Sequence, residues 1–313
     1  MLLPAGRYQV MSEKSDIAIL LLTCDRYVEV ATLTLDLLRQ LWKDPPQIFV
    51  CGVSGGLPGE FVIPFNVDDR DWMGIAHQAS EYLLEEGYGY CYLILDDHPP
   101  VARCNGEYLV KQVPALAREL NAAVVSMVGW DQIRTYRGTR LGAEKHYWLR
   151  NDPTYRWLFN LHPACWDIQA FKEILERAMA SGRDDRSART FEACTNSAVT
   201  LLPERLLMGS YRVCGDRFAS TGKWYGDPVM RKGILLALHG ARFAGKLLGG
   251  DSLLKKIDGR SKLFTDYLNG PYPMFWSGLM QKGEVHANAV RFLRLSGLGR
   301  HADIAGRLAK ING

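Results

Sequence analysis

The first half of the chain alternates between unbroken apolar runs and stretches in which apolar residues recur every three or four positions. The apolar runs are Asp16–Thr23, Gln47–Val53, Tyr90–Leu95 and Ala122–Val128. An unbroken run is typical of a strand buried on both faces, and the longer period between the runs predicts helices. We therefore expect an α/β fold with a mostly parallel, doubly wound sheet flanked by helices.

Further elements are predicted from weaker patterns. Phe61–Phe65 is expected to be a short edge strand, because Pro64 cannot donate a hydrogen bond to a central ladder. His162–Asp167 is expected to turn into a helix that continues to Ala178, since the apolar positions that follow it have helical spacing. The remaining predictions are helices that end near Trp42 and before Gly87, helices at about 106–120 and 189–196, and strands at Tyr155–Leu161 and Leu206–Val213.

The composition is that of an ordinary soluble globular protein, with 47% of the 313 residues hydrophobic and 23% charged. No apolar run reaches the roughly 18 residues of a membrane-spanning helix. The first residues lack the apolar core of a signal peptide, because Pro4 and polar residues follow Leu2 and Leu3 at once. The seven cysteines are odd in number and include no Cys-x-x-Cys pair, which argues against a disulfide framework or a zinc site. We expect a cytoplasmic protein.

Basic charge is concentrated at the end of the chain. From Met230 onward there are 14 Lys and Arg against 5 Asp and Glu, whereas the preceding residues hold 24 against 29. Arg231–Leu248 has the pattern of a basic amphipathic helix, which either lies on an anionic membrane or packs on the preceding domain. No nucleic-acid-binding module is recognisable, so we expect no nucleic-acid partner. We divide the chain into a leader at 1–15, a main domain at 16–228 and a basic helical extension at 229–313.

The most informative polar residues are Asp96 and Asp97, which directly follow the apolar run Tyr90–Leu95. Ligands of an open α/β sheet bind outside the carboxyl ends of its strands, so this pair is expected at a small-molecule site. Two adjacent carboxylates repel each other, and a divalent cation such as Mn²⁺ or Mg²⁺, bound together with a diphosphate, would relieve that repulsion. The alternative is that Asp-Asp-His-Pro is a polar turn that caps the next helix.

Short motifs along the chain occur in an informative order. They are Leu-Thr-Cys-Asp-Arg-Tyr at 22–27, Asp71-Trp72, Asp96-Asp97-His98, Leu-His-Pro-Ala-Cys-Trp at 161–166, Thr190-Phe191-Glu192 and Gly222-Lys223-Trp224. This order resembles bacterial nucleotide-sugar glycosyltransferases of the GT-A fold, over about residues 16–228. The resemblance implies a metal-dependent enzyme that moves a sugar from a nucleotide-diphosphate donor to a glycan or lipid-linked acceptor. A lipid-linked acceptor would suit peripheral contact of the basic extension with the inner face of the membrane.

The resemblance also implies roles for individual residues. The nucleoside would be bound by Thr23, Asp25, Arg26 and Asp71. Asp96 would contact the ribose or a metal-bound water, Asp97 would ligate the metal, and either His162 or His98 would complete the metal shell. The family's usual Asp-x-Asp is replaced here by Leu95-Asp96-Asp97, which leaves one direct carboxylate ligand.

Two more residues have roles in the expected chemistry. Cleavage of the sugar–diphosphate bond builds negative charge on the diphosphate, which Lys223 would neutralise. If the reaction inverts configuration, a general base must accept the proton of the acceptor hydroxyl, and Glu192 is the candidate. The alternative for Glu192 is a surface or capping role, in which case Asp131 or Asp184 would serve as the base.

Two other functions stay open at this point. A sugar-phosphate nucleotidyltransferase shares the architecture but would carry a Gly-rich phosphate loop with Arg and Lys, where this chain has Thr23-Cys24-Asp25-Arg26. A catalytically silent relative would bind a nucleotide-sugar or glycan as an assembly factor. Binding of nucleotide without turnover would distinguish the silent relative from the enzyme.

Overall fold

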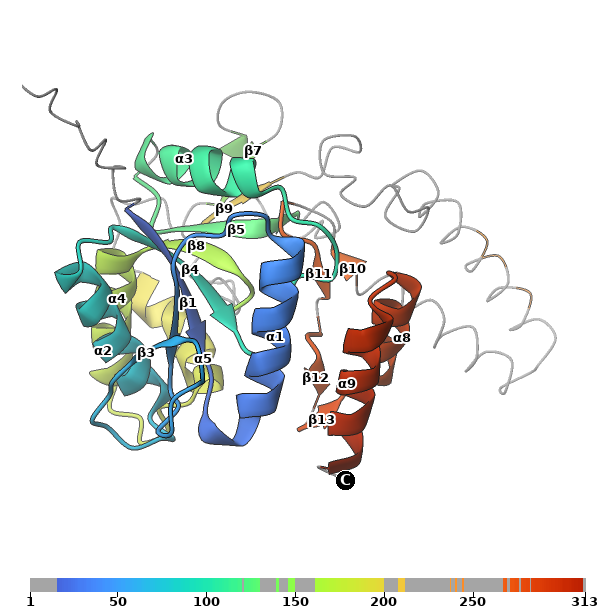
Figure 1. The fold of residues 1–313 in the computed structure, drawn as a ribbon. Helices are drawn as coiled ribbons and strands as arrows, with labels where there is room; N and C mark the ends of the chain where they lie inside the picture. The colour runs from blue at the N-terminus through green and yellow to red at the C-terminus, as the bar shows by residue number, and fades with distance from the viewer. Residues whose placement is uncertain are drawn as a thin grey trace, which may run out of the picture.

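The described residues form an α/β fold in which helices flank one large sheet (Figure 1). The computed structural model describes residues 16–119, 121–129, 139–140, 146–149, 161–199, 208–211, 267–268, 271–275, 277–281 and 283–311, with the single residues 237, 240 and 244. The strand predicted at Tyr155–Leu161 lies almost entirely outside these residues, as does the expected domain boundary at residue 228. Within the basic helix predicted at Arg231–Leu248, three residues are described, and all three are helical and exposed.

Nine strands of the described chain form the sheet, in the order β3-β2-β1-β4-β8-β5-β9-β7-β6. Their bounds are β1 Ile17–Leu22, β2 Ile48–Cys51, β3 Phe61–Ile63, β4 Tyr90–Leu95, β5 Val124–Gly129, β6 Thr139–Arg140, β7 His146–Leu149, β8 Ala164–Asp167 and β9 Met208–Tyr211. Four neighbouring pairs are parallel and four are antiparallel, because β7 and β8 run against their neighbours. The sheet is therefore mixed, and the prediction of a mostly parallel sheet is wrong.

The half of the sheet formed by β3, β2, β1 and β4 is fully parallel and agrees with the sequence prediction. All six residues of β1 are buried, as expected of a strand covered on both faces. β3 lies at the edge of the sheet and ends directly before Pro64, which confirms the predicted edge strand.

The strand β8 is the main departure from the predicted elements. Its residues were expected to turn into a helix, yet they lie between β4 and β5 and pair antiparallel with both. Leu93 pairs with Ala164, so β8 begins beside the end of β4. The helix starts only at Ile168, where the Asp167 side chain accepts a hydrogen bond from the Ala170 amide at 2.9 Å. A four-residue strand is too short to show a period of two, so its neighbours in the sheet decide its conformation.

Helices cover both faces of the sheet. Their bounds are α1 Val28–Leu41, α2 Trp72–Glu85, α3 Val113–Glu119, α4 Ile168–Met179 and α5 Ala188–Val199. A short 3₁₀ helix, η1 Asp25–Tyr27, leads into α1, and a short π-helix, η2 Tyr108–Gln112, leads into α3. Figure 1 shows α1 on one side of the sheet and α2, α4 and α5 on the other. The helices predicted before residue 200 are confirmed.

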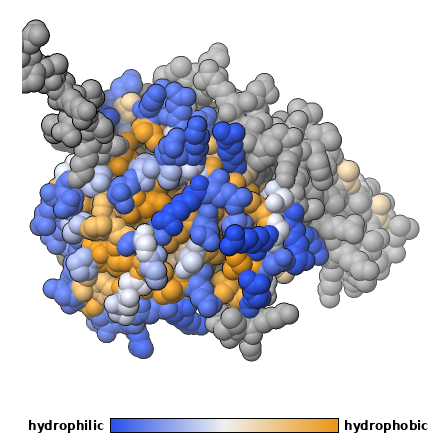
Figure 2. Space-filling view, viewed as in Figure 1, coloured by the Kyte–Doolittle hydropathy of each residue, from blue (hydrophilic) through white to orange (hydrophobic). Residues whose placement is uncertain are grey.

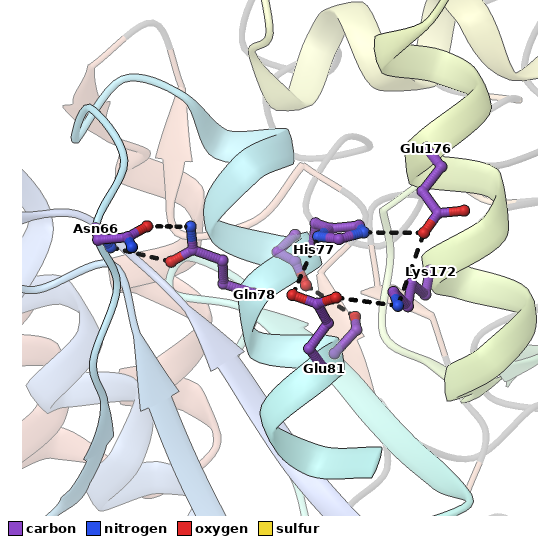
Figure 3. Close-up of polar contacts among 8 residues, drawn as sticks. Asn66, His77, Gln78, Glu81, Lys172 and Glu176 are labelled. Carbon is purple, nitrogen blue, oxygen red and sulfur yellow. Dashed lines mark hydrogen bonds and ion pairs between the residues drawn. The ribbon is translucent and has the colours of Figure 1, made fainter. Parts of the chain in front are cut away.

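A polar network on the surface joins α2 to α4 (Figure 3). His77 of α2 lies 3.1 Å from a carboxylate oxygen of Glu176, and Lys172 of α4 lies 3.0 Å from a carboxylate oxygen of Glu81. Each exposed ion pair of this kind contributes about 1 kcal/mol or less. The apolar faces of the two helices therefore provide most of their attachment to the sheet.

The described end of the chain packs against α1. It contains two hairpins and two helices, namely β10 Tyr267–Leu268 with β11 Met274–Phe275, β12 Met280–Gln281 with β13 Glu284–Val285, α8 Ala287–Leu295 and α9 Gly299–Ile311. Phe292 and Leu293 of α8 belong to a buried apolar cluster with Val30, Leu33 and Leu37 of α1. Figure 1 shows α9 alongside α1. The extension predicted as helical thus also contains strands, between residues 267 and 285.

Hydrophilic side chains lie between and over apolar ones on the face drawn in Figure 2. The large apolar side chain most exposed among the described residues is Phe61 of the edge strand β3, at 46%. The described chain contains no helix with both the length and the apolar character needed to cross a membrane.

We predict that His301, a buried side chain of α9, makes folding less favourable at acidic pH. Burial lowers the pKa of His301 below its usual 6.5, an effect that Asp36 of α1 opposes and Arg300 reinforces. The folded state thus binds the proton less readily than the unfolded chain, so stability is lost as the pH falls below about 6.5. Urea unfolding at about pH 7.5 and 5.5 should show a smaller loss in His301→Gln than in wild type. An equal loss in both proteins would contradict this prediction.

Candidate functional site

The first strand, β1, lies next to β4, the strand that the acid pair Asp96 and Asp97 follows. β1 and β4 are parallel, with Leu22 opposite Leu95, so the residues that follow them meet at one edge. After β1 the chain adds β2 and β3 on one side, whereas after β4 it adds β5 on the opposite side, and the later strand β8 lies between β4 and β5. The strand order therefore reverses direction between β1 and β4. In open α/β sheets, ligands bind at such a switch point, outside the carboxyl ends of the strands.

A hydrogen bond between the ends of β1 and β4 joins two of the predicted site residues. The Thr23 hydroxyl donates to Asp96 Oδ2 at 2.7 Å, and the Asp96 amide donates to the Leu22 carbonyl at 3.2 Å. The hydroxyl of Thr34 in α1 donates to the Asp96 carbonyl. These contacts fix both the backbone and the carboxylate of Asp96.

The carboxyl group of Asp96 is in an unfavourable environment for a negative charge. Burial and the adjacent Asp97 raise its pKa to about 7, although the Thr23 hydroxyl and His98 act in the opposite direction. A cation placed here would favour the ionised form of Asp96, because opposite charge offsets both desolvation and repulsion.

Asp97 contacts His98, which in turn packs against His162. Its Oδ1 lies 2.6 Å from His98 Nδ1, and the ring of His98 lies edge-on to that of His162 with centroids 5.1 Å apart. The Asp97 side chain is 21% exposed and that of His98 is 12% exposed. His162 reaches this position because β8 is antiparallel to β4 and begins where β4 ends.

Glu192 of α5 approaches the same group of residues. Its Oε1 accepts a hydrogen bond from the Leu161 amide at 2.8 Å, next to His162. Burial raises the pKa of Glu192, while the Leu161 amide and His98 lower it in part. The structure thus brings Asp96, Asp97, His162 and Glu192 toward one region, although they come from three different elements.

Asp25 is bound to the loop that follows β2. The Ser54 amide donates to Asp25 Oδ1 at 2.9 Å, and the Ser54 hydroxyl donates to Oδ2. These two hydrogen bonds lower the pKa of Asp25. Gly52 comes close to the same segment, with a φ of +100° and a position at which an added Cβ would lie 2.1 Å from the Thr23 carbonyl oxygen. The Ser54-Gly55-Gly56 loop therefore holds the end of β1 in place.

Arg26 lies next to Tyr27, with its guanidinium carbon 5.5 Å from the ring centroid. Its terminal nitrogen is also close to the β12–β13 turn, since a Cβ on Gly283 would lie 3.6 Å from it. Arg26 is thus placed between η1 and the end of the chain.

Asp71 links the start of α2 to the loop that precedes α5. Its Oδ1 accepts from the Gly74 amide at 2.8 Å as the N-cap of α2, and its Oδ2 accepts from Arg186 at 3.0 Å. The neighbouring Trp72 packs on Phe191 with centroids 5.4 Å apart, and Phe191 directly precedes Glu192. Sequence reasoning missed Arg186, because no local pattern indicates that it pairs with a residue so distant in the chain.

Other candidates are placed elsewhere or not described. Lys223 and Asp131 lie outside the described residues. Asp184 is exposed on the connection between α4 and α5. Within the described residues, no three side chains of His, Cys, Asp or Glu are grouped so as to hold a metal ion.

Comparison with known proteins does not identify the chain. No family model matches it, and a search of curated proteins found no match.

We predict that Asp96→Asn changes the pH dependence of stability in metal-free protein. Asp96 has a folded-state pKa of about 7 against an ordinary 3.8, so its contribution to stability is full below about pH 4 and is lost as the pH rises to 7. An amide does not ionise, so the variant should gain stability relative to wild type between about pH 5 and pH 8. Urea unfolding with a chelator checks this, with exposed Asp184→Asn as control. A difference between variant and wild type that stays constant with pH would contradict it.

Proposed function

We propose that the chain is a glycosyltransferase of the GT-A type, which moves a sugar from a nucleotide-diphosphate donor to a glycan or lipid-linked acceptor. The observation that carries this proposal is the Thr23–Asp96 hydrogen bond between the ends of β1 and β4, where the strand order reverses direction. Asp97 lies beside Asp96 in the chain. This arrangement supports a ligand site at the edge that a nucleotide would occupy in an open α/β sheet. Asp25 lies two residues after Thr23 and is hydrogen-bonded to Ser54 in the loop after β2.

A divalent cation, Mn²⁺ or Mg²⁺, is part of the proposal. Because no three His, Cys, Asp or Glu side chains of the described residues are grouped to hold a metal by themselves, we propose a hard cation that keeps waters and binds through one or two carboxylates plus substrate phosphates. Asp97 would hold it, with Asp96 at the ribose or a bound water and His162 as a further ligand. When bound, such a cation stabilises the negative charge that develops on the leaving diphosphate.

The protein's own residues would position the substrates and accept a proton. Glu192 is proposed as general base for an inverting reaction, supported by its partial burial and its raised pKa, which brings a carboxylate closer to the operating pH. Lys223 is proposed as the side chain that neutralises the diphosphate. Asp25, Arg26 and Asp71 are proposed to contact the nucleoside.

A catalytically silent binding protein is the second candidate. The observation that favours it is the Asp97–His98 contact at 2.6 Å, which engages one of the two carboxylate oxygens that Asp97 could offer to a metal. Such a protein would bind a nucleotide-sugar without transferring the sugar.

We expect one nucleoside diphosphate among UDP, GDP and dTDP to raise the melting temperature in the presence of Mn²⁺. A ligand at about 100 times its dissociation constant stabilises the native state by about 2.7 kcal/mol. Asp97→Asn should lose the Mn²⁺-dependent part of this shift, whereas the exposed Asp303→Asn of α9 should keep it. If no nucleotide shifts the melting temperature, or if Asp97→Asn behaves as wild type, the proposed site is wrong.

Glu192→Gln should lower kcat by about 10² to 10⁴ with little change in the KM for the donor, because the amide cannot accept a proton. In the wild type, activity should decrease as the pH falls through the raised pKa of Glu192. Transfer assays with a panel of acceptors measure both effects, with exposed Glu107→Gln as the matched control. Nucleotide binding with no turnover by wild type on any acceptor would favour the silent protein.

A further inference from the structure

The described end of the chain touches the Asp97 turn directly. The Leu279 amide donates to the Asp97 carbonyl at 2.6 Å. The hydroxyl of Tyr272, a fully buried residue, donates to the His98 carbonyl at 2.9 Å. The Val101 amide, just beyond, donates to the Pro273 carbonyl at 2.8 Å. A segment that is distant in the sequence, with Tyr272 174 residues from His98, thus fixes the backbone of both Asp97 and His98.

Gly278 of this segment lies against the Asp97 side chain. It is buried, its φ is +68°, and an added Cβ would lie 2.8 Å from Asp97 Oδ2 and 2.9 Å from the Asp97 carbonyl oxygen. Both distances are shorter than real Cβ contacts. Only glycine leaves room for the carboxylate in its present orientation, in which Oδ1 meets His98 Nδ1.

The segment is in turn held by the C-terminal helices. Phe275 of β11 packs edge-on against Phe292 of α8, with centroids 4.6 Å apart. The His286 amide donates to the Leu279 carbonyl at 2.7 Å, directly before α8 begins. Since α8 and α9 share a buried cluster with α1, the docking of these helices on α1 determines where Gly278 and Leu279 lie.

We propose that Gly278 is a positioning residue for Asp97, and that the C-terminal segment thereby completes the site at the end of β4. Gly278 sets the orientation of the carboxylate, and Leu279 and Tyr272 hold the backbone of the turn. The importance of Asp97 for a metal–diphosphate rests on the proposed function, whereas the positioning itself does not.

The positioning is tested in full-length, metal-free protein through the imidazole of His98. A carboxylate only accepts hydrogen bonds, so the contact with Asp97 keeps the proton of the neutral ring on Nδ1. Imidazole ¹⁵N NMR at about pH 8 should show this tautomer in wild type, and Gly278→Ala should shift it toward a mixture of tautomers. Gly182→Ala is the matched control, because Gly182 has a similar φ of +74° with no atom near its Cβ position. A His98 spectrum in Gly278→Ala that equals those of wild type and control would overturn the proposal.

Tyr272→Phe keeps the test decisive if Gly278→Ala does not fold. It removes the hydroxyl that bonds the His98 carbonyl and introduces no strained φ. The same change in the His98 tautomer, smaller in size, is expected. An unchanged spectrum in this variant would also overturn the proposal.

The consequence for ligand binding is measured separately, by titration of Mn²⁺ in the presence of UDP, GDP or dTDP. Residues that orient a metal ligand typically change metal affinity by about 10-fold to 100-fold, and we expect a weakening of about 10-fold or more in Gly278→Ala. If His98 responds to the substitution but wild type binds no Mn²⁺ with any nucleotide, the proposed function fails while the positioning stands. If wild type binds Mn²⁺ with a nucleotide and Gly278→Ala binds it equally well, the claim that the C-terminal segment completes the site fails, while the proposed function stands.

Discussion

Two adjacent carboxylates at the end of a buried strand impose the constraint on which the rest of the site depends. Burial and mutual repulsion disfavour a second negative charge there, and the raised pKa of Asp96 is the result. The protein offsets part of this cost with the Thr23 hydroxyl on one side and His98 on the other. These groups do not offset the whole cost of the negative charge. A positive charge would offset the remainder, and this is the physical basis of the proposed cation.

Segments that are distant in the sequence converge on the end of β4 where this acid pair lies. The parallel pair β1 and β4 brings Thr23 to Asp96, and the reversed strand β8 brings His162 to His98. α5 adds Glu192 through its hydrogen bond to Leu161. The C-terminal segment adds hydrogen bonds from Leu279 and Tyr272 to the backbone of Asp97 and His98. A site assembled from so many elements is sensitive to packing far from it.

The parts of the fold that the sequence predicts well are those decided by long local patterns. The runs that became β1 and β4 are unbroken and apolar because both of their faces are buried, and the acid pair after β4 was found for the same reason. β8 could not be found this way, because four residues show no period and its place depends on pairing with β4 and β5. The roles of Arg186 and Gly278 likewise depend on contacts with Asp71 and Asp97 that no local pattern encodes. The sheet is mixed because the short strands β7 and β8, whose places depend on pairing with distant segments, run antiparallel to their neighbours.

The central claim is that a divalent cation binds between the ends of β1 and β4 together with a nucleoside diphosphate. Paramagnetic broadening by Mn²⁺ of backbone amide NMR signals locates such an ion directly. The account predicts strong broadening at Thr23, Asp97 and His98 that appears only when a nucleoside diphosphate is present. Broadening that centres on the surface carboxylates of α2 and α4, or that is absent at the end of β4 with every nucleotide, would contradict it.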